Sequence, residues 1–186
     1  MQERGAAPPL TTAAQPGSGA RRLLVTLSVA AVVVAADQAS KSWAVHRLSH
    51  GSIHVIWKLD LALAYNSGSS FSLAQGWGTV LAGIAIVFVV VLLATARRAQ
   101  SDTMAVAIGL IVGGALGNLV DRALRGHHGS VVDFVALHFW PTFNLADASI
   151  VTGALLAGVV LWRAPSANEM DAAAGDGPAA GGGALT

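Results

Sequence analysis

Cysteine is absent from the 186 residues of the chain, and charged residues are scarce. Without cysteine, a disulfide framework, a thiolate metal site and a cysteine nucleophile are all excluded. Charged residues make up 11% of the sequence, whereas hydrophobic residues make up 54%. Since about 25% of the residues in an ordinary soluble domain are charged, this composition predicts an integral membrane protein.

Clusters of basic residues are missing as well. The formal net charge is +1, and no run of arginine or lysine exceeds two residues. Nucleic-acid binding and polybasic membrane anchoring both depend on clustered positive charge. The sequence therefore argues against a nucleic-acid partner and against a polybasic anchor.

Four apolar segments each approach the length of about 20 residues that crosses roughly 30 Å of hydrocarbon as a helix. The segments are approximately 23–45, 77–96, 104–120 and 143–162. We therefore expect an all-α integral membrane protein with four transmembrane helices in one domain over residues 23–162. Segments 1–22 and 163–186 lack an apolar period, and we expect both to be disordered cytoplasmic tails.

The distribution of arginine predicts the orientation of these spans. Four crossings place both termini on one side, where Arg21, Arg22, Arg97, Arg98 and Arg163 flank the spans. The positive-inside rule makes that side cytoplasmic. The loops at about 46–76 and 121–142 then face outward. Residues 53–64 alternate apolar and polar, which indicates a small extracytoplasmic layer of short strands, with an amphipathic interfacial helix as the alternative.

Polar residues gather at the outer ends of the predicted spans. Asp37 and Lys41 have the i, i+4 spacing of a helical salt bridge, and we interpret them as a structural pair that orients or stabilises the first helix. Gly109, Gly113 and Gly117 recur every four residues in the third span. Small residues at this spacing allow another helix to approach closely, so this face predicts helix packing.

Two further pairs mark the third and fourth spans. Asn118 and Asp121 end one span, and Asn144 and Asp147 begin the next, and the members of each pair are three positions apart. An ionisable residue in or beside a span is a functional-site hypothesis. Because Arg122 adjoins Asp121, an ion pair with it or with another nearby base would offset that charge, and we interpret Asp121 as scaffold.

Asp133 and Asp147 differ from the other acids because no basic residue lies within four positions of either. Their nearest plausible partner is each other, and two adjacent carboxyl groups share one proton near neutral pH. Aspartic proteolysis uses such a pair to activate water and protonate the scissile carbonyl. From chemistry alone, a proton relay in a transporter or a divalent-cation site remains open. The metal site has the least support, because His127 and His128 resemble a solvated turn.

Five motifs, occurring in order over about residues 23–162, resemble the lipoprotein signal peptidases, the bacterial signal peptidase II family of aspartic peptidases. They are Asp37-Gln38-Ala39-Ser40-Lys41, Asn66-Ser67-Gly68-Ser69-Ser70-Phe71, Gly113 through Arg122, Val131-Val132-Asp133-Phe134 and Phe143-Asn144-Leu145-Ala146-Asp147.

The resemblance implies a membrane endopeptidase that cleaves diacylglyceryl-modified prolipoproteins just before the lipidated cysteine. It implies no cofactor or metal, contact with membrane lipids, and inhibition by globomycin-type peptides. It further implies a bacterial cytoplasmic membrane location with the active site near the outer face, and we expect a monomer. By motif, the catalytic dyad is Asp133 and Asp147, and the binding or supporting residues are Asn66, Gly68, Asn118, Asp121, Arg122 and Asn144.

Three departures from the family pattern fall on loops. Ser69 and Ser70 stand where alanines are common, residues 127–129 lengthen one turn, and the connection from Phe134 to Phe143 is short. Loops tolerate such changes, so they bear on the substrate entrance more than on the chemistry.

Two other functions remain as alternatives. A small ion- or proton-coupled transporter would use Asp37 and Asp147 as a relay, but the inner halves of the spans have no ionisable residue. A membrane assembly factor that only packs through its glycines would leave Asp133 and Asp147 unexplained.

Overall fold

The computed structural model describes residues 18–67, 78–125 and 129–163. The predicted tails therefore lie outside the described residues up to position 17 and from position 164, and so do Gly68 and the histidine turn at 127–128. The described elements, in chain order, are α1 (Ser18–Leu48), β1 (Ile53–Ile56), β2 (Leu59–Asn66), α2 (Gly78–Ala96), α3 (Asp102–Leu124), β3 (Val131–Leu137), β4 (Trp140–Phe143) and α4 (Leu145–Trp162).

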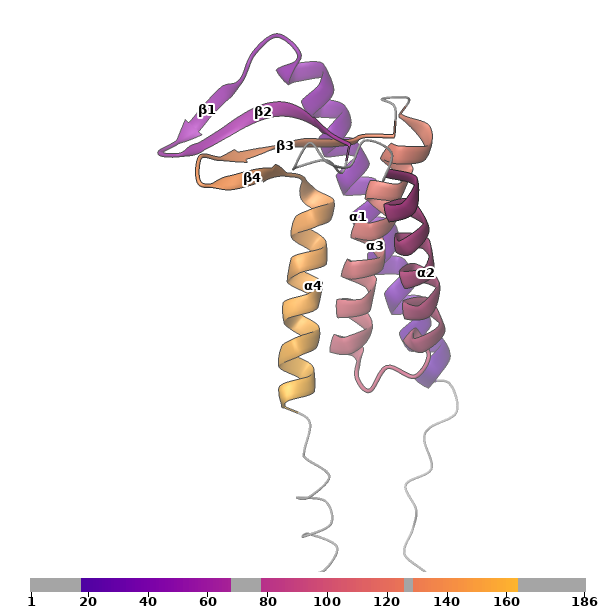
Figure 1. Ribbon diagram of the computed structural model, residues 1–186. Helices are drawn as coiled ribbons and strands as arrows, with labels where there is room; N and C mark the ends of the chain where they lie inside the picture. Colours follow the sequence, from indigo (N-terminus) through magenta and orange to yellow (C-terminus); the bar gives the residue numbers. More distant parts are fainter. Residues whose placement is uncertain (1–17, 68–77, 126–128, 164–186) are drawn as a thin grey trace, which may run out of the picture.

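The helices run side by side, and the strands lie across one end of the bundle (Figure 1). Helix α3 packs against α1, α2 and α4. The first residues of α1 and the last residues of α4 lie at the end opposite the sheet (Figure 1). Residues near the sheet ends of α1, α3 and α4 are thereby brought together.

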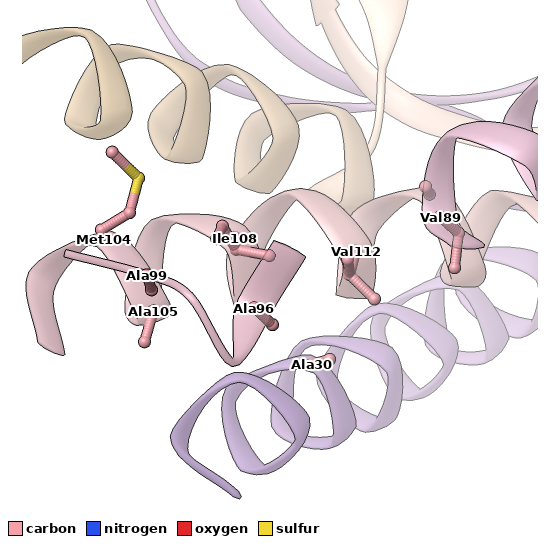
Figure 2. Close-up of a cluster of buried hydrophobic side chains, with 9 residues drawn as sticks. Ala30, Val89, Ala96, Ala99, Met104, Ala105, Ile108 and Val112 are labelled. Atoms are coloured by element: carbon pink, nitrogen blue, oxygen red, sulfur yellow. The ribbon is translucent and has the colours of Figure 1, made fainter. Parts of the chain in front are cut away.

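An apolar core joins α1, α2 and α3. Figure 2 shows its side chains, among them Ala30 of α1, Val89 of α2 and Val112 of α3. The predicted glycine face of α3 packs against α1, because a Cβ at Gly109 would lie 2.8 Å from the Thr26 carbonyl oxygen and one at Gly113 would lie 2.9 Å from the Ala30 carbonyl oxygen. Only glycine permits this separation, so the packing prediction is confirmed.

Among the described residues, α1, α3 and α4 are long and apolar enough to cross a membrane. Helix α2 contributes a shorter apolar helix, Ala82–Ala96. The expectation of four helices is confirmed, and the crossing of the membrane by α2 stays a prediction.

The expected helical bundle with a small layer of strands is confirmed, but the all-α class is too narrow, because the strands form a four-stranded antiparallel sheet in the order β1-β2-β3-β4. The predicted strands at 53–64 are confirmed, and the interfacial-helix alternative is wrong. The segment 121–142, expected to be a loop, contains the end of α3, β3 and most of β4. Four successive residues at the start of β3 are buried, so this strand lacks the alternation that revealed β2.

Helix ends also differ from the expected boundaries. Helix α1 begins at Ser18, so residues 18–22 are helical rather than part of a disordered tail. Its first turn is fixed because Arg21 pairs with Asp102 and Arg22 donates to the Ala99 carbonyl oxygen at 2.6 Å. Helix α3 extends to Leu124, four residues past the expected end of the span at 120.

Candidate active site

Polar side chains from four elements meet where the sheet covers the bundle. Helix α1 supplies Asp37 and Lys41, α3 supplies Asn118 and Asp121, β3 supplies Asp133, and the start of α4 supplies Asn144 and Asp147. Sequence separations of up to 109 residues are bridged by single hydrogen bonds. The predicted site residues on these elements therefore form one connected network.

Lys41 is the centre of the network and is fully buried. Its Nζ atom lies 2.9 Å from Asp37 Oδ2, 2.9 Å from Asp121 Oδ2 and 2.9 Å from Asn118 Oδ1. An ammonium group has three N–H donors, so each donor has an acceptor. The predicted pair of Asp37 and Lys41 is therefore present in α1, and Lys41 also contacts Asp121 and Asn118 of α3.

Asp121 has two oxygens that each accept two hydrogen bonds. Oδ2 accepts from Lys41 Nζ and from the backbone N–H of Val132 at 3.0 Å. Oδ1 lies 2.9 Å from Arg125 Nε and 2.9 Å from Gln38 Nε2. These contacts connect α1, α3 and β3, and they give Asp121 a full set of partners.

The expected ion pair of Asp121 with Arg122 or another nearby base is made by Arg125. Residues four apart lie on one face of a helix, whereas adjacent residues do not. Arg125 also donates from Nη2 to Gln38 Oε1 at 3.1 Å and to Ser42 Oγ at 3.0 Å. Sequence reasoning assigned no role to Gln38 or Arg125, although the i, i+4 spacing would have found the second.

Asp37 links α1 to the start of α4. Its Oδ1 atom accepts from the backbone N–H of Ala146 at 3.0 Å, while Oδ2 faces Lys41. Gly117 leaves the space for this carboxylate, because a Cβ there would lie 2.5 Å from Asp37 Oδ2.

Asp133 is buried on β3 and held by two amides. Asn144 Nδ2 donates to its Oδ1 at 2.7 Å, and Asn66 Nδ2 donates to its Oδ2 at 3.1 Å. Burial raises the pKa of Asp133 to about 6, and the negative charge of Asp147 contributes to the increase, while the two amide hydrogen bonds and Lys41 oppose it. A carboxyl group in this state exchanges a proton near neutral pH.

Asp147 lies in the first turn of α4, in a capping box with Asn144. Asn144 Oδ1 accepts from the Asp147 N–H at 3.0 Å, and Asp147 Oδ2 accepts from the Asn144 N–H at 3.2 Å. This reciprocal pair satisfies two backbone donors at the helix start. Asn118 Nδ2 donates to the other carboxylate oxygen at 2.8 Å, so the side chain is held from both α3 and α4.

Asn144 connects the two acids that were expected to form the dyad. Its side chain donates to Asp133 and its backbone N–H donates to Asp147. The same Nδ2 atom also approaches Asn118 Oδ1 at 3.2 Å. The start of α4 therefore fixes both acids through one buried residue.

Arg122 lies beside this pair. Its Nη1 atom makes a long contact of 3.5 Å to the Asn118 carbonyl oxygen, and its buried Nε atom has no hydrogen-bond partner among the described residues. The charge of Asp147 acts on it more strongly than those of Asp121 and Asp133. A cation with an unused donor next to two acids suits the binding of a carbonyl oxygen.

A second polar cluster lies on the exposed face of the sheet. Asp60 Oδ1 contacts His54 Nδ1 at 2.7 Å, and Asp60 Oδ2 contacts His138 Nε2 at 2.9 Å. The hydrogen bond from His138, followed by that from His54, lowers the pKa of Asp60. Over the part of the chain that is described, no group of three or more His, Cys, Asp or Glu side chains is arranged to hold a metal ion.

Two carboxyl groups that both accept from the buried residue Asn144 lie at the polar end of an apolar helical bundle, an arrangement that supplies the groups acid–base chemistry needs. The family model described as "Signal peptidase (SPase) II" matches residues 29–163. The chain belongs to this family, and it is a peptidase. The family match gives no support to the transporter alternative.

Individual relatives agree with the family match. The chain is 46% identical over 144 residues to the lipoprotein signal peptidase of Mycobacterium avium, covering 73% of this chain and 78% of that protein. It is 42% identical over 168 residues to the lipoprotein signal peptidase of Mycobacterium tuberculosis, covering 82% of each. A bacterial membrane enzyme solved by the in meso method matches with a TM-score of 0.67 and 30% identity, over 75% of this chain and 94% of that one.

Proposed function

We propose that this peptidase is an aspartic endopeptidase that removes the signal peptide of a prolipoprotein immediately before a diacylglyceryl-modified cysteine. The family and the names of the relatives support the class of substrate. The observation that carries the catalytic type is the meeting of Asp133 and Asp147 on Asn144. One acid comes from the sheet and the other from a helix start.

The two acids take different parts in the proposed reaction. Burial raises the pKa of Asp133 to about 6, and in its protonated form Asp133 donates its proton to the carbonyl oxygen of the scissile amide. Asp147, in the first turn of α4, takes a proton from the attacking water. The proton belongs to the coupled pair, so its loss is one titration of the dyad.

The balance of charges supports one proton on the pair. In the scaffold, Lys41 and Arg125 offset Asp37 and Asp121. Arg122 then remains as a cation that interacts with the charges of Asp147 and Asp133. A singly protonated dyad carries one negative charge, which Arg122 balances. Doubly ionised acids would leave a net negative charge in a site that is largely removed from water, which is costly.

The neighbouring residues suit the binding of a peptide backbone. We assign Arg122 to a substrate carbonyl oxygen, because its Nε donor is buried without a partner among the described residues. Asn66 lies at the end of β2 and donates to Asp133, so it borders the reacting bond. Gly68 belongs to the same assignment by motif. Asn118, Asp121 and Asn144 support the dyad, and globomycin-type peptides compete at this site.

We place the protein in a bacterial cytoplasmic membrane as a monomer with four spans, α2 being the fourth. Both termini are cytoplasmic, and the sheet with the dyad is at the outer face. The arginines at the ends of the helices opposite the sheet support this orientation. A lipidated substrate reaches the dyad from the bilayer, so its acyl chains remain in hydrocarbon during cleavage.

A cleavage assay with defined substrates tests the proposed function. Purified full-length protein in liposomes is given a prolipoprotein with a diacylglyceryl-modified cysteine, and the unmodified precursor is the control. Mass spectrometry of the products should show cleavage immediately before the lipidated cysteine and an intact unmodified precursor. An intact lipidated substrate with folded enzyme, or cleavage at another bond, contradicts the proposal.

A further inference from the structure

We propose that Lys41 sets the relative position of the Asp133 and Asp147 carboxyl groups through two parallel chains of contacts, each ending on the backbone N–H that precedes one of these acids. The inference rests on the proposed function, because it assumes that these two acids react. It assigns Lys41, Asp37 and Asp121 as positioning residues, which goes beyond stabilising one helix.

The first chain of contacts runs from α1 through α3 to β3. Lys41 Nζ lies 2.9 Å from Asp121 Oδ2, and the same oxygen accepts from the Val132 N–H at 3.0 Å. Val132 is fully buried and directly precedes Asp133. The position of the ammonium group therefore fixes the backbone from which the Asp133 side chain projects.

The second chain runs from α1 directly to α4. Lys41 Nζ lies 2.9 Å from Asp37 Oδ2, and Asp37 Oδ1 accepts from the Ala146 N–H at 3.0 Å. Ala146 is fully buried and directly precedes Asp147. Strand β3 and helix α4 are thus held in the same way. In each, a buried carboxylate accepts from the backbone N–H of the residue that precedes a catalytic acid.

A third contact of Lys41 reaches the dyad itself. Asn118 Oδ1 accepts from Lys41 at 2.9 Å, and Asn118 Nδ2 donates to Asp147 Oδ1 at 2.8 Å. The lysine also fixes which way this amide faces, because a cation requires the carbonyl oxygen and leaves the NH₂ group for Asp147. All three donors of one ammonium group consequently act on the geometry of the dyad.

The chemistry of the arrangement requires a lysine. Asp37 and Asp121 both place an oxygen within 2.9 Å of Nζ, so they would repel each other without the cation between them. Charge-assisted hydrogen bonds in a site without solvent are shorter and stronger than neutral ones. Arginine cannot replace lysine here, because its planar fork of donors does not match three acceptors around a point. Loss of the Lys41 cation would therefore break both chains of contacts at their shared starting point.

Two glycines of α3 provide the space for the second chain. A Cβ at Gly117 would lie 2.5 Å from Asp37 Oδ2, and a Cβ at Gly114 would clash with the Ala146 carbonyl oxygen. The atom that a methyl group at Gly117 would meet, Asp37 Oδ2, is the end of a short side chain. The added methyl group therefore displaces the carboxylate and leaves the backbone in place. This substitution therefore disturbs the second chain without touching either catalytic acid.

Asp37→Asn, Asp121→Asn and the double variant test the proposal in the cleavage assay. Each single change should lower kcat of the folded, monodisperse fraction about tenfold and leave KM within about twofold, because a misplacement of roughly 1 Å can cost up to about a hundredfold. The double variant should lose less than the product of the single losses, because both chains share Lys41.

Gly117→Ala and Gly113→Ala form a matched pair. Both add a methyl group to the same face of α3 against α1, but the atoms nearest to the Gly113 methyl group belong to Val33 and to the Ala30 backbone, outside the charged network. Gly113→Ala should lower thermal stability and leave kcat of the folded fraction unchanged. Gly117→Ala should lower kcat severalfold at a smaller cost in stability.

The pH profile separates positioning from a loss of folded protein. Asp133 faces Asn66 of β2, Asn144 and Asp147 at the start of α4, Lys41 of α1 and the Arg122 charge of α3. Its raised pKa is due chiefly to burial, so loosening β3 in Asp121→Asn admits water and moves the alkaline limb of kcat/KM to lower pH. A smaller folded fraction lowers kcat/KM by the same factor at every pH and leaves the pH of the alkaline limb unchanged.

The outcomes distinguish the two proposals. If wild type cleaves and the folded Asp37→Asn, Asp121→Asn and Gly117→Ala variants retain wild-type kcat and pH profile, the positioning role of Lys41 is wrong and the proposed function stands. If folded wild type does not cleave the lipidated precursor, the proposed function is wrong, and the positioning role fails with it.

Discussion

The described part of the chain contains two clusters in which one charged side chain lies between two partners. One cluster is buried and the other is exposed to solvent. In one, the cation Lys41 lies between the carboxylates of Asp37 and Asp121, and all three side chains are 0% exposed. In the other, the carboxylate of Asp60 lies between two imidazoles that are 64% and 55% exposed. The first joins α1, α3, α4 and β3, whereas the second joins β1, β2 and the turn between β3 and β4.

Burial gives these similar contacts different consequences. In water, the partners of a broken ion pair are solvated, so exposed pairs contribute little to stability. In a buried cluster, the removal of one member leaves the others charged and without water. The exposed cluster can therefore change with little effect, and the buried one makes the fold and the active site depend on the same side chains.

Removal of the buried cation should have the largest effect on stability. Lys41→Met is expected to destabilise the protein by about 3–5 kcal/mol, because Asp37 would be left buried without a counter-ion and Asp121 would keep only Arg125. Thermal unfolding in detergent and the yield of membrane-inserted protein measure the loss. Lys58→Met, on the exposed turn of the sheet, is the matched control and should behave like wild type. Equal stability of the two variants would contradict the comparison.

Loss of the Asn144 side chain, which caps α4 and donates to Asp133, should have the next largest effect. Asn144→Ala removes the N-cap of α4, which costs about 1 kcal/mol, and also removes the donor to Asp133. Both the melting temperature and kcat should fall. Ser101→Ala removes the N-cap of α3 at the opposite end of the bundle and should lower stability by a similar amount at unchanged kcat. A loss of activity in Ser101→Ala equal to that in Asn144→Ala would show that capping alone explains the effect.

The buried acid of the dyad should make stability depend on pH. Because the folded-state pKa of Asp133 is raised to about 6 from 3.8, its contribution to stability is complete below about pH 4 and is lost as pH rises through 6. The melting temperature of wild type should therefore fall relative to that of Asp133→Asn between pH 4 and pH 7. A constant difference over this range would mean that Asp133 titrates as an exposed acid.

The smallest effects are expected in the exposed cluster. His138→Ala and His54→Ala should leave thermal stability and cleavage unchanged within error, since these side chains are already in contact with water. Each change should raise the pKa of Asp60 toward its ordinary value, and His138→Ala should raise it further, because His138 contributes the larger hydrogen-bond effect. NMR titration of the labelled carboxyl group measures this order. A clear loss of stability in either variant would remove the contrast with the buried cluster.

The buried cluster was partly predictable from local spacing. The i, i+4 spacing of Asp37 and Lys41 and the glycine face of α3 follow from helix geometry, and both contacts occur in the structure. The choice of Arg125 over Arg122 as the partner of Asp121 obeys the same rule. In contrast, the hydrogen bonds from Ala146 and Val132 to buried carboxylates depend on how distant elements pack, and no local pattern indicates them.

The sheet was predictable only where its sequence alternates apolar and polar residues. Residues 53–64 alternate apolar and polar and form β1 and most of β2. The buried start of β3 has no such alternation, and β4 has only four residues, including Pro141. The bounds of α1 depended on ion pairs with Asp102 that lie more than 75 residues away in the chain. Tertiary contacts decided these features.

The most direct test of the account is the cleavage of a diacylglyceryl-modified prolipoprotein, followed by gel shift, with purified wild type, Asp133→Asn, Asp147→Asn and Asp60→Asn. Asp60→Asn is the matched control, because it makes the same change at an exposed acid on the sheet. We predict cleavage by wild type and Asp60→Asn and none by the two folded dyad variants. Cleavage near the wild-type rate by either Asp133→Asn or Asp147→Asn would show that the two acids are not the catalytic pair.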